Sequence, residues 1–459
     1  MERVDVAIVG GGPGGSSAAR TAAAAGAEAV VFEKGVPRED RERAGPDSTD
    51  AAGMLDYWLD LMDEEVSDIP DDVILQELDG AAFLGPSENV FLQSTGMDAT
   101  YDGFGFCYQR ARLDDWLRRE AENAGAEYRV GTGVSDVTST AEDGGYRHHL
   151  TLQDGHEVEA DALVLADGPG RQLTMPTLDQ FLPEGESASV RLAPPETNHI
   201  AYQEYREFPA EVFEDDRISF WWGWMPGETA YPWVFPNDGT VARVGLTMPI
   251  GMDLEDVENP EAYRLLREDD DRIPGGAEYV RRLLEELYGD EYDIEEDFPR
   301  VESRGKSKGT ETYPISSTKP IDSPTGADLA VVGGAMGATS AFHEGGTHVA
   351  VRTGKIAGRL AAEGDLGQYN DEWKDAIGDE ILRNVAIADV VEDFGPDDWD
   401  RTFRITREMQ DANDGGWSLS RRSARSASGG VKLYASYKRA KFRYRKGKYV
   451  QMRESEYDL

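Results

Sequence analysis

The chain has 459 residues, enough for two or three structural units built around large apolar cores. It carries 89 Asp and Glu against 47 Lys and Arg, and this formal net charge of −42 argues against nucleic acid as a partner. The single cysteine, Cys107, excludes an intramolecular disulfide, a cysteine-ligated iron–sulfur cluster and a multi-cysteine zinc site. Any redox chemistry would therefore need a bound cofactor.

Lysine is scarce, with 11 Lys beside 36 Arg, whereas 39% hydrophobic residues and 9 Trp indicate a folded protein. Such a composition resembles that of salt-in halophiles, whose carboxylates hold water while salt screens their repulsion. The acidic runs lack the spacing of a calcium loop, so we expect no metal site. Neither a signal peptide nor an apolar stretch of membrane-spanning length is visible, so we expect a cytoplasmic protein.

The first 33 residues have the pattern of a dinucleotide-binding unit. An apolar run over 4–9 predicts a buried parallel strand, and helical character resumes over 16–25. A second predicted strand, 28–32, leads into Glu33, whose carboxylate suits the ribose hydroxyls of adenosine and disfavours a 2′-phosphate. The glycines between the first strand and the helix give G-x-G-x-x-G, for a tight turn, close approach to a pyrophosphate and close helix packing. They are Gly10, Gly12 and Gly15.

Two later segments favour FAD over NAD, because a simple NAD-binding domain has no need of them. Residues 162–171 are an apolar strand that runs into Asp167-Gly168. Residues 328–355 give a strand, a glycine-rich loop and the start of a helix. The loop glycines that we expect at the cofactor are Gly333, Gly337, Gly345 and Gly346.

This order of motifs resembles that of glutathione-reductase-like flavoproteins of the hydroxylase and geranylgeranyl reductase type. Residues 110–117 (RARLDDWL) with 124–127 are similar to that group's R-x-x-[FL]-D-x-x-L…aGae segment, whose arginine, here Arg110, lies near the flavin. The resemblance implies a helix N-terminus after Gly346 that meets the flavin pyrimidine edge. The chain departs from the group at Gly334, where many relatives have aspartate, and at His343-Glu344, in a loop usually rich in proline and glycine.

The resemblance also implies an α/β (α+β) architecture, in which an antiparallel-sheet substrate domain is inserted into a glutathione-reductase-like FAD-binding Rossmann domain. A C-terminal helical region follows. The expected segments are 1–75, 105–180 and 310–362 for FAD binding, 76–104 and 181–309 for the sheet, and 363–459 for the helices.

Short alternating segments over 186–250, separated by Pro and Gly, predict the antiparallel sheet. Residues 231–236 (YPWVFP) match Y-x-W-x-F-P, the signature of geranylgeranyl reductases, which hydrogenate isoprenoid double bonds; residues 245–247 (GLT) match only the first glycine of the family's G-x-G. Stacked aromatic side chains suit an apolar tunnel for an elongated polyene, although plain core is the alternative. The predicted substrate-binding residues are Tyr231, Trp233, Phe235 and Trp222.

Reduction of an isolated alkene needs a hydride from reduced flavin, a proton from an acid, and exclusion of water. Some archaeal members of the family place a cysteine in the loop after the second strand. Here residues 45–53 contain none, so that residue is not carried over. Asp47, Ser48 and His343 are the candidate proton donors.

The C-terminal segment 421–453 contrasts with the rest of the chain, because it holds 12 basic residues and no acidic one. Interleaved tyrosines and phenylalanines suit an interface with anionic phospholipid headgroups, which would make the protein a peripheral membrane protein. The alternative, equally open, is that this segment neutralises the acidic body of the protein or a partner subunit.

These observations favour an FAD-dependent oxidoreductase that hydrogenates geranylgeranyl double bonds of archaeal membrane lipids. Ferredoxin and NAD(P)H are both open as electron donors, since no second complete G-x-G-x-x-G is visible. A flavin monooxygenase is the enzyme alternative; halogenation is disfavoured because Lys34 is the only lysine before Lys306. A non-catalytic FAD-containing electron-transfer or scaffold subunit is the third hypothesis.

Overall fold

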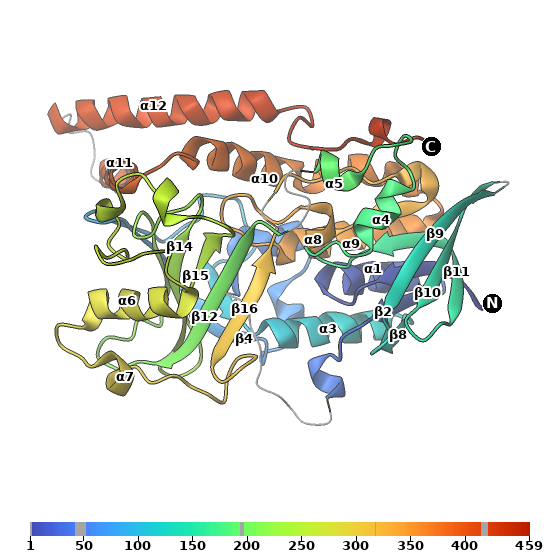
Figure 1. Cartoon of the computed structure of the whole chain (residues 1–459), viewed down its shortest axis with the longest axis horizontal. Coiled ribbons are helices and arrows are strands. Elements are labelled where there is room, and N and C mark those ends of the chain that lie inside the picture. The colour runs from blue at the N-terminus through green and yellow to red at the C-terminus, as the bar shows by residue number, and fades with distance from the viewer. Residues whose placement is uncertain (1, 42–51, 143, 193–196, 317, 415–420) are drawn as a thin grey trace.

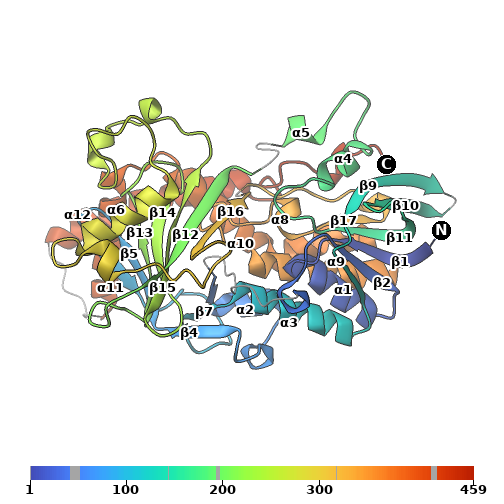
Figure 2. The ribbon, with the colours of Figure 1, turned by 60° about the horizontal axis from the view of Figure 1, so that its bottom comes forward.

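The computed structural model describes residues 2–41, 52–142, 144–192, 197–316, 318–414 and 421–459, the side chains of 411–414 and 421–429 excepted. Two sheets lie side by side, and the C-terminal helices run along both of them (Figure 1, Figure 2). The first sheet carries the nucleotide-binding motifs and the second carries the aromatic motif. This is the mixed α/β architecture that the sequence predicts.

The first sheet has a parallel core with an antiparallel hairpin beside it. The run β8-β2-β1-β11 is parallel, while the first half of β11 pairs with the hairpin β9–β10 and its second half with β17. The carboxyl ends of β1, β2, β11 and β17 therefore meet at one edge, where open parallel sheets bind their ligands. The strands are β1 (Glu2–Val9), β2 (Ala29–Glu33), β8 (Glu127–Val130), β9 (Val134–Glu142), β10 (Gly145–Leu152), β11 (Glu157–Leu165) and β17 (Leu329–Val331).

Helices α1 and α9 pack against each other on this sheet, and α3 lies beside α1. The approach of α9 to α1 is close because α9 presents glycines. A Cβ at Gly354 would collide with the carbonyl oxygen of Gly14, and one at Gly358 with that of Ala18. The helices of this unit are α1 (Pro13–Ala24), α3 (Arg110–Asn123), α4 (Thr174–Asp179), α5 (Ala188–Arg191), α8 (Gly333–Met336) and α9 (Thr347–Glu363).

The second sheet has the strand order β16-β12-β15-β14-β13-β5-β6, antiparallel except for the pair β13–β5. Its strands are β5 (Gly80–Leu84), β6 (Asn89–Leu92), β12 (His199–Glu207), β13 (Arg217–Trp221), β14 (Tyr231–Pro236), β15 (Val241–Pro249) and β16 (Thr310–Ile315). The boundary predicted at residue 310 is wrong, because β16 pairs with β12 and so belongs to this sheet. A strand that returns from a distant part of the chain carries no local signal of its partner.

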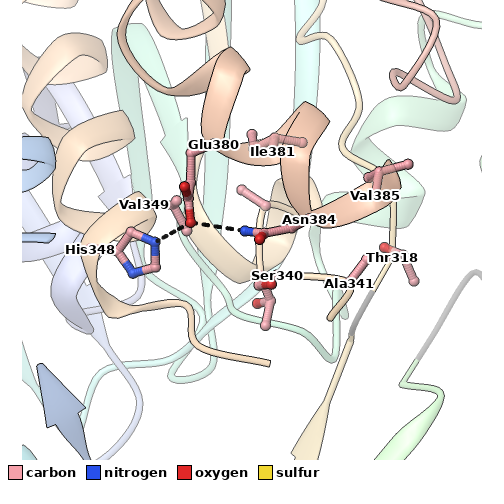
Figure 3. A pocket seen from close by; sticks show the side chains of 11 residues that line it. Thr318, Ser340, Ala341, His348, Val349, Glu380, Ile381, Asn384 and Val385 are labelled. Carbon is pink, nitrogen blue, oxygen red and sulfur yellow. Dashed lines mark hydrogen bonds and ion pairs between the residues drawn. The ribbon is translucent and has the colours of Figure 1, made fainter. Parts of the chain in front are cut away.

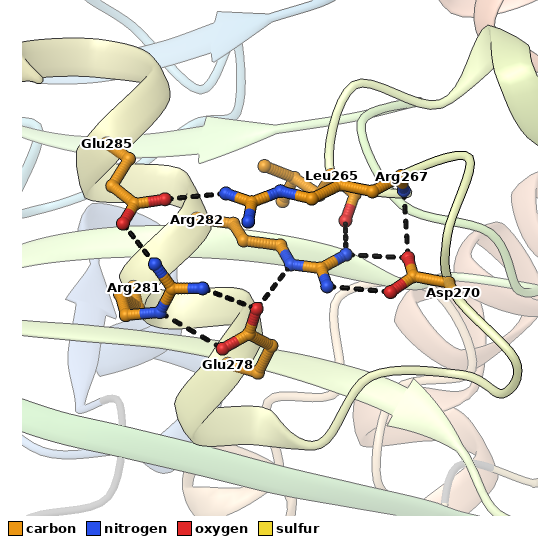
Figure 4. Close-up of polar contacts among 7 residues, drawn as sticks. All are labelled: Leu265, Arg267, Asp270, Glu278, Arg281, Arg282 and Glu285. Carbon is orange, nitrogen blue, oxygen red and sulfur yellow. Dashed lines mark hydrogen bonds and ion pairs between the residues drawn. The ribbon is translucent and has the colours of Figure 1, made fainter.

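Helix α6 (Gly276–Tyr288) covers the outer face of the second sheet with a buried apolar stripe that includes Tyr279, Leu283 and Leu284. Its other face holds an ion-pair network, in which Arg282 binds both carboxylate oxygens of Asp270 at 2.7 Å (Figure 4). The short helix α7 (Ile294–Asp297) follows. The acidic surface of this unit is thus partly organised by arginine pairs.

A small sheet and a helix connect the two larger units. The sheet has the order β3-β7-β4. These elements are β3 (Gly53–Leu55), β4 (Ile74–Leu78), β7 (Gly105–Tyr108) and α2 (Asp56–Met62). Because α2 packs on α9, its aromatic residues reach the glycine-rich loop that follows β17.

Three C-terminal helices, α10 (Tyr369–Val391), α11 (Pro396–Asp414) and α12 (Arg421–Tyr444), span both units. Trp373 of α10 lies in the core of the first unit, and Trp399 of α11 lies in that of the second. Figure 1 shows α12 along the outside of α10. The chain then returns to the first core, where Met452 is fully buried. Within the described residues, no helix has the length and apolar character of a membrane span.

Candidate active site

Three glycines at the edge of the first sheet meet three different surroundings. Gly10 follows β1 with a φ of +101°, and a Cβ there would collide with the carbonyl oxygen of Ala166. A Cβ on Gly15 would collide with the carbonyl oxygen of Gly10. Gly12, in contrast, has no described atom within 4 Å of its Cβ position, so its backbone is open to a ligand. This cradle at the N-terminus of α1 fits a pyrophosphate.

Glu33 ends β2 beside this cradle, and two backbone amides fix the direction of its carboxylate. Its Oε2 accepts a hydrogen bond from the Gly11 amide at 2.7 Å, and its Oε1 accepts one from the Gly35 amide at 2.5 Å. Each carboxylate oxygen has a second lone pair, so both remain able to accept from ribose hydroxyls. The adenosine half of FAD therefore fits the residues that are present.

Asp167 and Gly168 form the turn after β11, and the Asp167 carboxylate holds that turn. It accepts hydrogen bonds from the amides of Leu173 at 2.7 Å and Thr174 at 3.1 Å, at the start of α4. A Cβ on Gly334 would lie 3.2 Å from the ring of Pro169. A side chain on Gly334 would therefore be crowded by this turn, which gives a packing reason for glycine here.

The buried Arg171, which sequence reasoning did not single out, anchors the glycine-rich loop. Its Nε donates to the carbonyl oxygen of Ala335 at 2.9 Å. Desolvation lowers the pKa of Arg171 to about 10, against the opposing charge of Asp167. A Cβ on Gly337 would lie 2.7 Å from its Nη2, and one on Gly333 would lie 2.9 Å from the Cβ of Ala350. Both predicted loop glycines therefore have a packing role in the described structure.

Arg110, predicted near the flavin, begins α3, and its Nε donates to Asp114 at 2.9 Å one turn later. Lys34 is exposed, with its Nζ 3.4 Å from the amide oxygen of Gln172. Asp47 and Ser48 lie outside the described residues. A cofactor role for Arg110 stays a prediction.

Aromatic side chains cover the N-terminus of α9. The indole of Trp58 stacks on the imidazole of His348, with ring centroids 4.1 Å apart and planes 8° apart. A Cβ on Gly345 would lie 2.8 Å from that indole, and one on Gly346 would lie 3.0 Å from the Thr339 hydroxyl. Trp58 follows no motif in the sequence, so only the packing of α2 on α9 brings it to this site.

A buried carboxylate on α10 lies behind the same helix end. Figure 3 shows Glu380, Asn384 and His348 around a cavity of about 10 Å³. Glu380 accepts from Asn384 at 2.9 Å and from the Tyr57 hydroxyl at 3.2 Å. Desolvation raises the pKa of Glu380, but the hydrogen bond from His343 and the charge of Arg383, which forms an ion pair with Glu380, help to hold that pKa at about 2. Burial lowers the pKa of His348 to about 3, so this imidazole is neutral.

His343, a predicted proton donor, is directed toward this network. Its Nδ1 accepts from the amide of Gly345 at 3.1 Å, and its Nε2 lies 3.6 Å from Glu380 and 3.3 Å from Asn384. The imidazole therefore faces α10 rather than the second sheet. A donor role for His343 stays a prediction that the geometry does not favour.

The aromatic strand β14 meets the glycine-rich loop. The Tyr231 hydroxyl donates to the carbonyl oxygen of His343 at 3.1 Å, and Trp222 stacks on Tyr231 with centroids 4.3 Å apart. Tyr231, Trp233 and Phe235 alternate along the strand and so share one face, and all three are buried. The predicted residues therefore gather where the two units meet.

Gly245 lies opposite Trp233 across β14 and β15, and a Cβ there would lie 2.7 Å from the indole. The first glycine of the G-x-G segment thus leaves room for the tryptophan. Trp399 of α11 packs against Trp222, with ring centroids 4.5 Å apart. Substrate contact by these side chains stays a prediction.

Comparison with known proteins agrees with this geometry. The FAD binding domain family matches residues 5–102. The chain is 25% identical over 394 residues to digeranylgeranylglycerophospholipid reductase 2 of Methanopyrus kandleri, covering 82% of this chain and 83% of that protein. It is 25% identical over 410 residues to the digeranylgeranylglycerophospholipid reductase of Methanothrix thermoacetophila, covering 86% and 89%.

Solved structures share the fold. A geranylgeranyl bacteriochlorophyll reductase-like protein from Thermoplasma acidophilum superposes with a TM-score of 0.65 at 23% identity, covering 97% of this chain and 99% of that one. The flavin-dependent brominase Bmp2 has a TM-score of 0.56 at 16% identity, which extends the likeness of fold to flavoproteins of other chemistry.

The glycine cradle, the Glu33 carboxylate and the order of the first sheet define an FAD-dependent oxidoreductase. Within this class, the chain carries the Y-x-W-x-F-P strand and is similar over most of its length to digeranylgeranylglycerophospholipid reductases.

Proposed function

We propose that this protein hydrogenates the geranylgeranyl double bonds of an archaeal membrane lipid. The observation that carries the proposal is the contact between Tyr231 of the aromatic strand and the backbone of His343, three residues before the last loop glycine. It brings an apolar surface of the second unit against the loop that leads into α9. The reductases to which the chain is similar along more than four-fifths of its length support the same substrate class.

FAD, when bound and reduced, supplies the hydride equivalent for a double bond. The chain's residues hold and shield it. Gly12 and Glu33 would hold its adenosine diphosphate half, and the positive end of the α9 dipole would favour negative charge on the reduced cofactor. Trp233 and its buried neighbours exclude water from the isoprenoid chain of the lipid, and this exclusion protects the reduced cofactor from side reactions.

The direct test is anaerobic incubation of dithionite-reduced protein with digeranylgeranylglycerophospholipid, followed by mass spectrometry of the lipid. We expect the lipid to gain two hydrogens per double bond reduced. An unchanged lipid beside fully reduced protein contradicts the proposal. Incorporation of oxygen in an aerobic reaction would instead establish the monooxygenase alternative.

We also propose that α12 contacts an anionic lipid surface. Val431, Tyr434 and Phe442 are exposed on it, and exposed basic residues alternate with them. Among the described side chains of α12, Arg443 alone forms a salt bridge with the acidic body, to Asp389 at 2.8 Å. Most of the basic side chains that the structure describes on this helix therefore have no ion pair with the other described residues, which favours an external anionic partner over the internal alternative.

A further inference from the structure

The loop before α9 carries a buried carboxyl group that faces the second sheet. Glu344 has a φ of +58°, an uncommon conformation for a residue with a side chain, and its side chain is 4% exposed. Its Oε1 accepts from the Thr229 hydroxyl at 3.4 Å and lies 3.7 Å from Nε2 of His199 on β12. The loop backbone thus directs this side chain away from the FAD-binding unit and toward the second sheet.

Thr247 of β15 joins Glu344 at this place. It pairs with Tyr231 across the strands and so lies on the same face of the sheet. Within the described residues, Glu344 Oε2 and Thr247 Oγ1 are both buried and make no hydrogen bond of normal geometry, although the Thr247 hydroxyl is close enough to Glu344 to lower the pKa of its carboxyl group. A buried carboxyl oxygen without a well-formed hydrogen bond is costly, and the position of this one beside the aromatic face is consistent with a functional role.

We propose that Glu344 is the proton donor of the reduction. This inference rests on the proposed function. One carbon of the double bond receives a hydride equivalent from the reduced cofactor, and the π electron pair forms a new C–H bond from the other carbon to the carboxyl proton of Glu344. The O–H electron pair stays on the carboxylate, which solvent protonates again before the next turnover.

The surroundings keep this carboxyl protonated at neutral pH. Desolvation raises the pKa of Glu344 to about 8, although the Thr247 and Thr229 hydroxyls lower it and the charge of Glu228 raises it. Burial also lowers the pKa of His199, whose Nε2 donates to the Glu228 carbonyl oxygen at 3.0 Å. The facing histidine is therefore neutral and offers no positive charge that would ionise the acid. The hydroxyl of Tyr231 is a further titratable neighbour, and burial and the charge of Glu344 raise its pKa well above its usual value.

The experiment compares Glu344→Gln with the wild type and with a control variant, Glu228→Gln, which replaces a nearby acidic residue that is exposed. Each protein is reduced with dithionite, mixed anaerobically with digeranylgeranylglycerophospholipid, and followed by flavin absorbance. We expect Glu344→Gln to slow flavin reoxidation by about 100-fold or more, with unchanged flavin content and unchanged reduction by dithionite. The wild-type rate should fall as pH rises through about 8. Glu228→Gln should keep the rate of flavin reoxidation at neutral pH. It should shift the pH at which this rate falls to a lower value, because it removes a like charge that raises the pKa of Glu344.

A readout independent of turnover is the pH dependence of Tm. The carboxyl of Glu344 stays protonated in the folded protein up to about pH 8 but ionises near pH 4.5 once unfolded. Ionisation on unfolding favours the unfolded state, so wild-type stability falls relative to Glu344→Gln as pH rises between these values. Infrared difference spectra at pH 6.5 should show a protonated carboxyl group that is absent from Glu344→Gln.

The possible outcomes distinguish a failure of the donor assignment from a failure of the proposed function on which it rests. If lipid does not reoxidise the wild-type flavin, the proposed function is wrong and the donor assignment falls with it. If lipid reoxidises wild type and Glu344→Gln at equal rates, only the donor assignment is wrong. An ionised Glu344 in the infrared spectrum at pH 6.5 overturns the assignment in either case.

Discussion

At the scale of single residues, the glycines of the nucleotide turn differ in what a side chain would meet. Gly12 faces open space, so Gly12→Val should fold and yet lose FAD, because its side chain occupies the approach to the pyrophosphate. Gly15→Val should instead destabilise the fold, since its Cβ collides with backbone. Flavin absorbance per protein and Tm measure the two effects. Stoichiometric flavin in Gly12→Val contradicts the assignment of the cradle.

The aromatic face allows a second residue-scale prediction with a matched control. Trp233 and Trp221 are both buried, but Trp233 lies in the core that faces the FAD-binding unit and Trp221 in the core beneath α6. Each substitution to alanine should lower the free energy of unfolding by about 3–5 kcal/mol. Only Trp233→Ala should also impair lipid reduction while dithionite still reduces the flavin. Equal activity of the two variants would assign Trp233 to packing alone.

The residues that sequence analysis found and missed differ in how local their signals are. Gly12 and Glu33 belong to a contiguous strand–turn–helix–strand unit, whose spacing alone fixes their place at the sheet edge. Arg171, Glu344 and Trp58 act through partners more than a hundred residues away, such as Ala335 and His199. No periodicity records such contacts. The sequence alone does not distinguish Glu344 from its neighbour His343 as a proton donor, because the direction of a loop side chain depends on the backbone, here the positive φ of Glu344.

At the scale of elements, the strand–loop–helix of residues 329–363 was predictable because each piece has its own pattern. The pairing of β16 with β12 and the return of the C-terminal segment to the first core were not. In that segment the Tyr457 hydroxyl donates to the Asp322 carbonyl oxygen at 2.8 Å, and Met452 is fully buried. Removal of everything after residue 420 would therefore damage the FAD-binding unit as well as α12.

Substitutions on α12 test lipid contact without that damage. Lys432, Lys438 and Arg439 are exposed, and replacing all three with glutamine should weaken binding to anionic liposomes on the order of 100-fold at low salt, at about 1 kcal/mol for each charge. Turnover of detergent-solubilised lipid should stay unchanged, because the flavin and aromatic residues lie elsewhere. Liposome sedimentation and the turnover assay measure the two properties.

The matched control replaces three exposed basic residues outside α12, namely Arg272, Lys306 and Lys308, with glutamine. This variant has the same net charge as the α12 variant, so equal weakening by both would indicate a general charge effect. Intact liposome binding by the α12 variant, together with a lower Tm, would assign the helix to internal neutralisation instead.

At the scale of the whole molecule, the net charge of −42 sets the dependence of folding on salt. Like charges at this density repel one another in the compact state, and salt screens that repulsion with a Debye length of about 10 Å at 0.1 M and 3 Å at 1 M. We expect Tm to rise substantially between 0.1 M and 2 M KCl. A flat or falling Tm would contradict a halophilic role for the acidic surface.

Two neighbouring aspartates separate repulsion from pairing within this salt dependence. Asp269 is exposed, whereas Asp270 holds the mostly buried Arg282 through two hydrogen bonds of 2.7 Å (Figure 4). Asp269→Asn should raise Tm slightly at 0.1 M KCl and have no effect at 2 M, because it removes a repulsion that salt already screens. Asp270→Asn should cost about 2 kcal/mol at both concentrations, since it breaks a charge-assisted, largely desolvated pair. If the Tm of the two variants depends on salt in the same way, the ion pair between Asp270 and Arg282 contributes no more to stability than an exposed carboxylate such as that of Asp269.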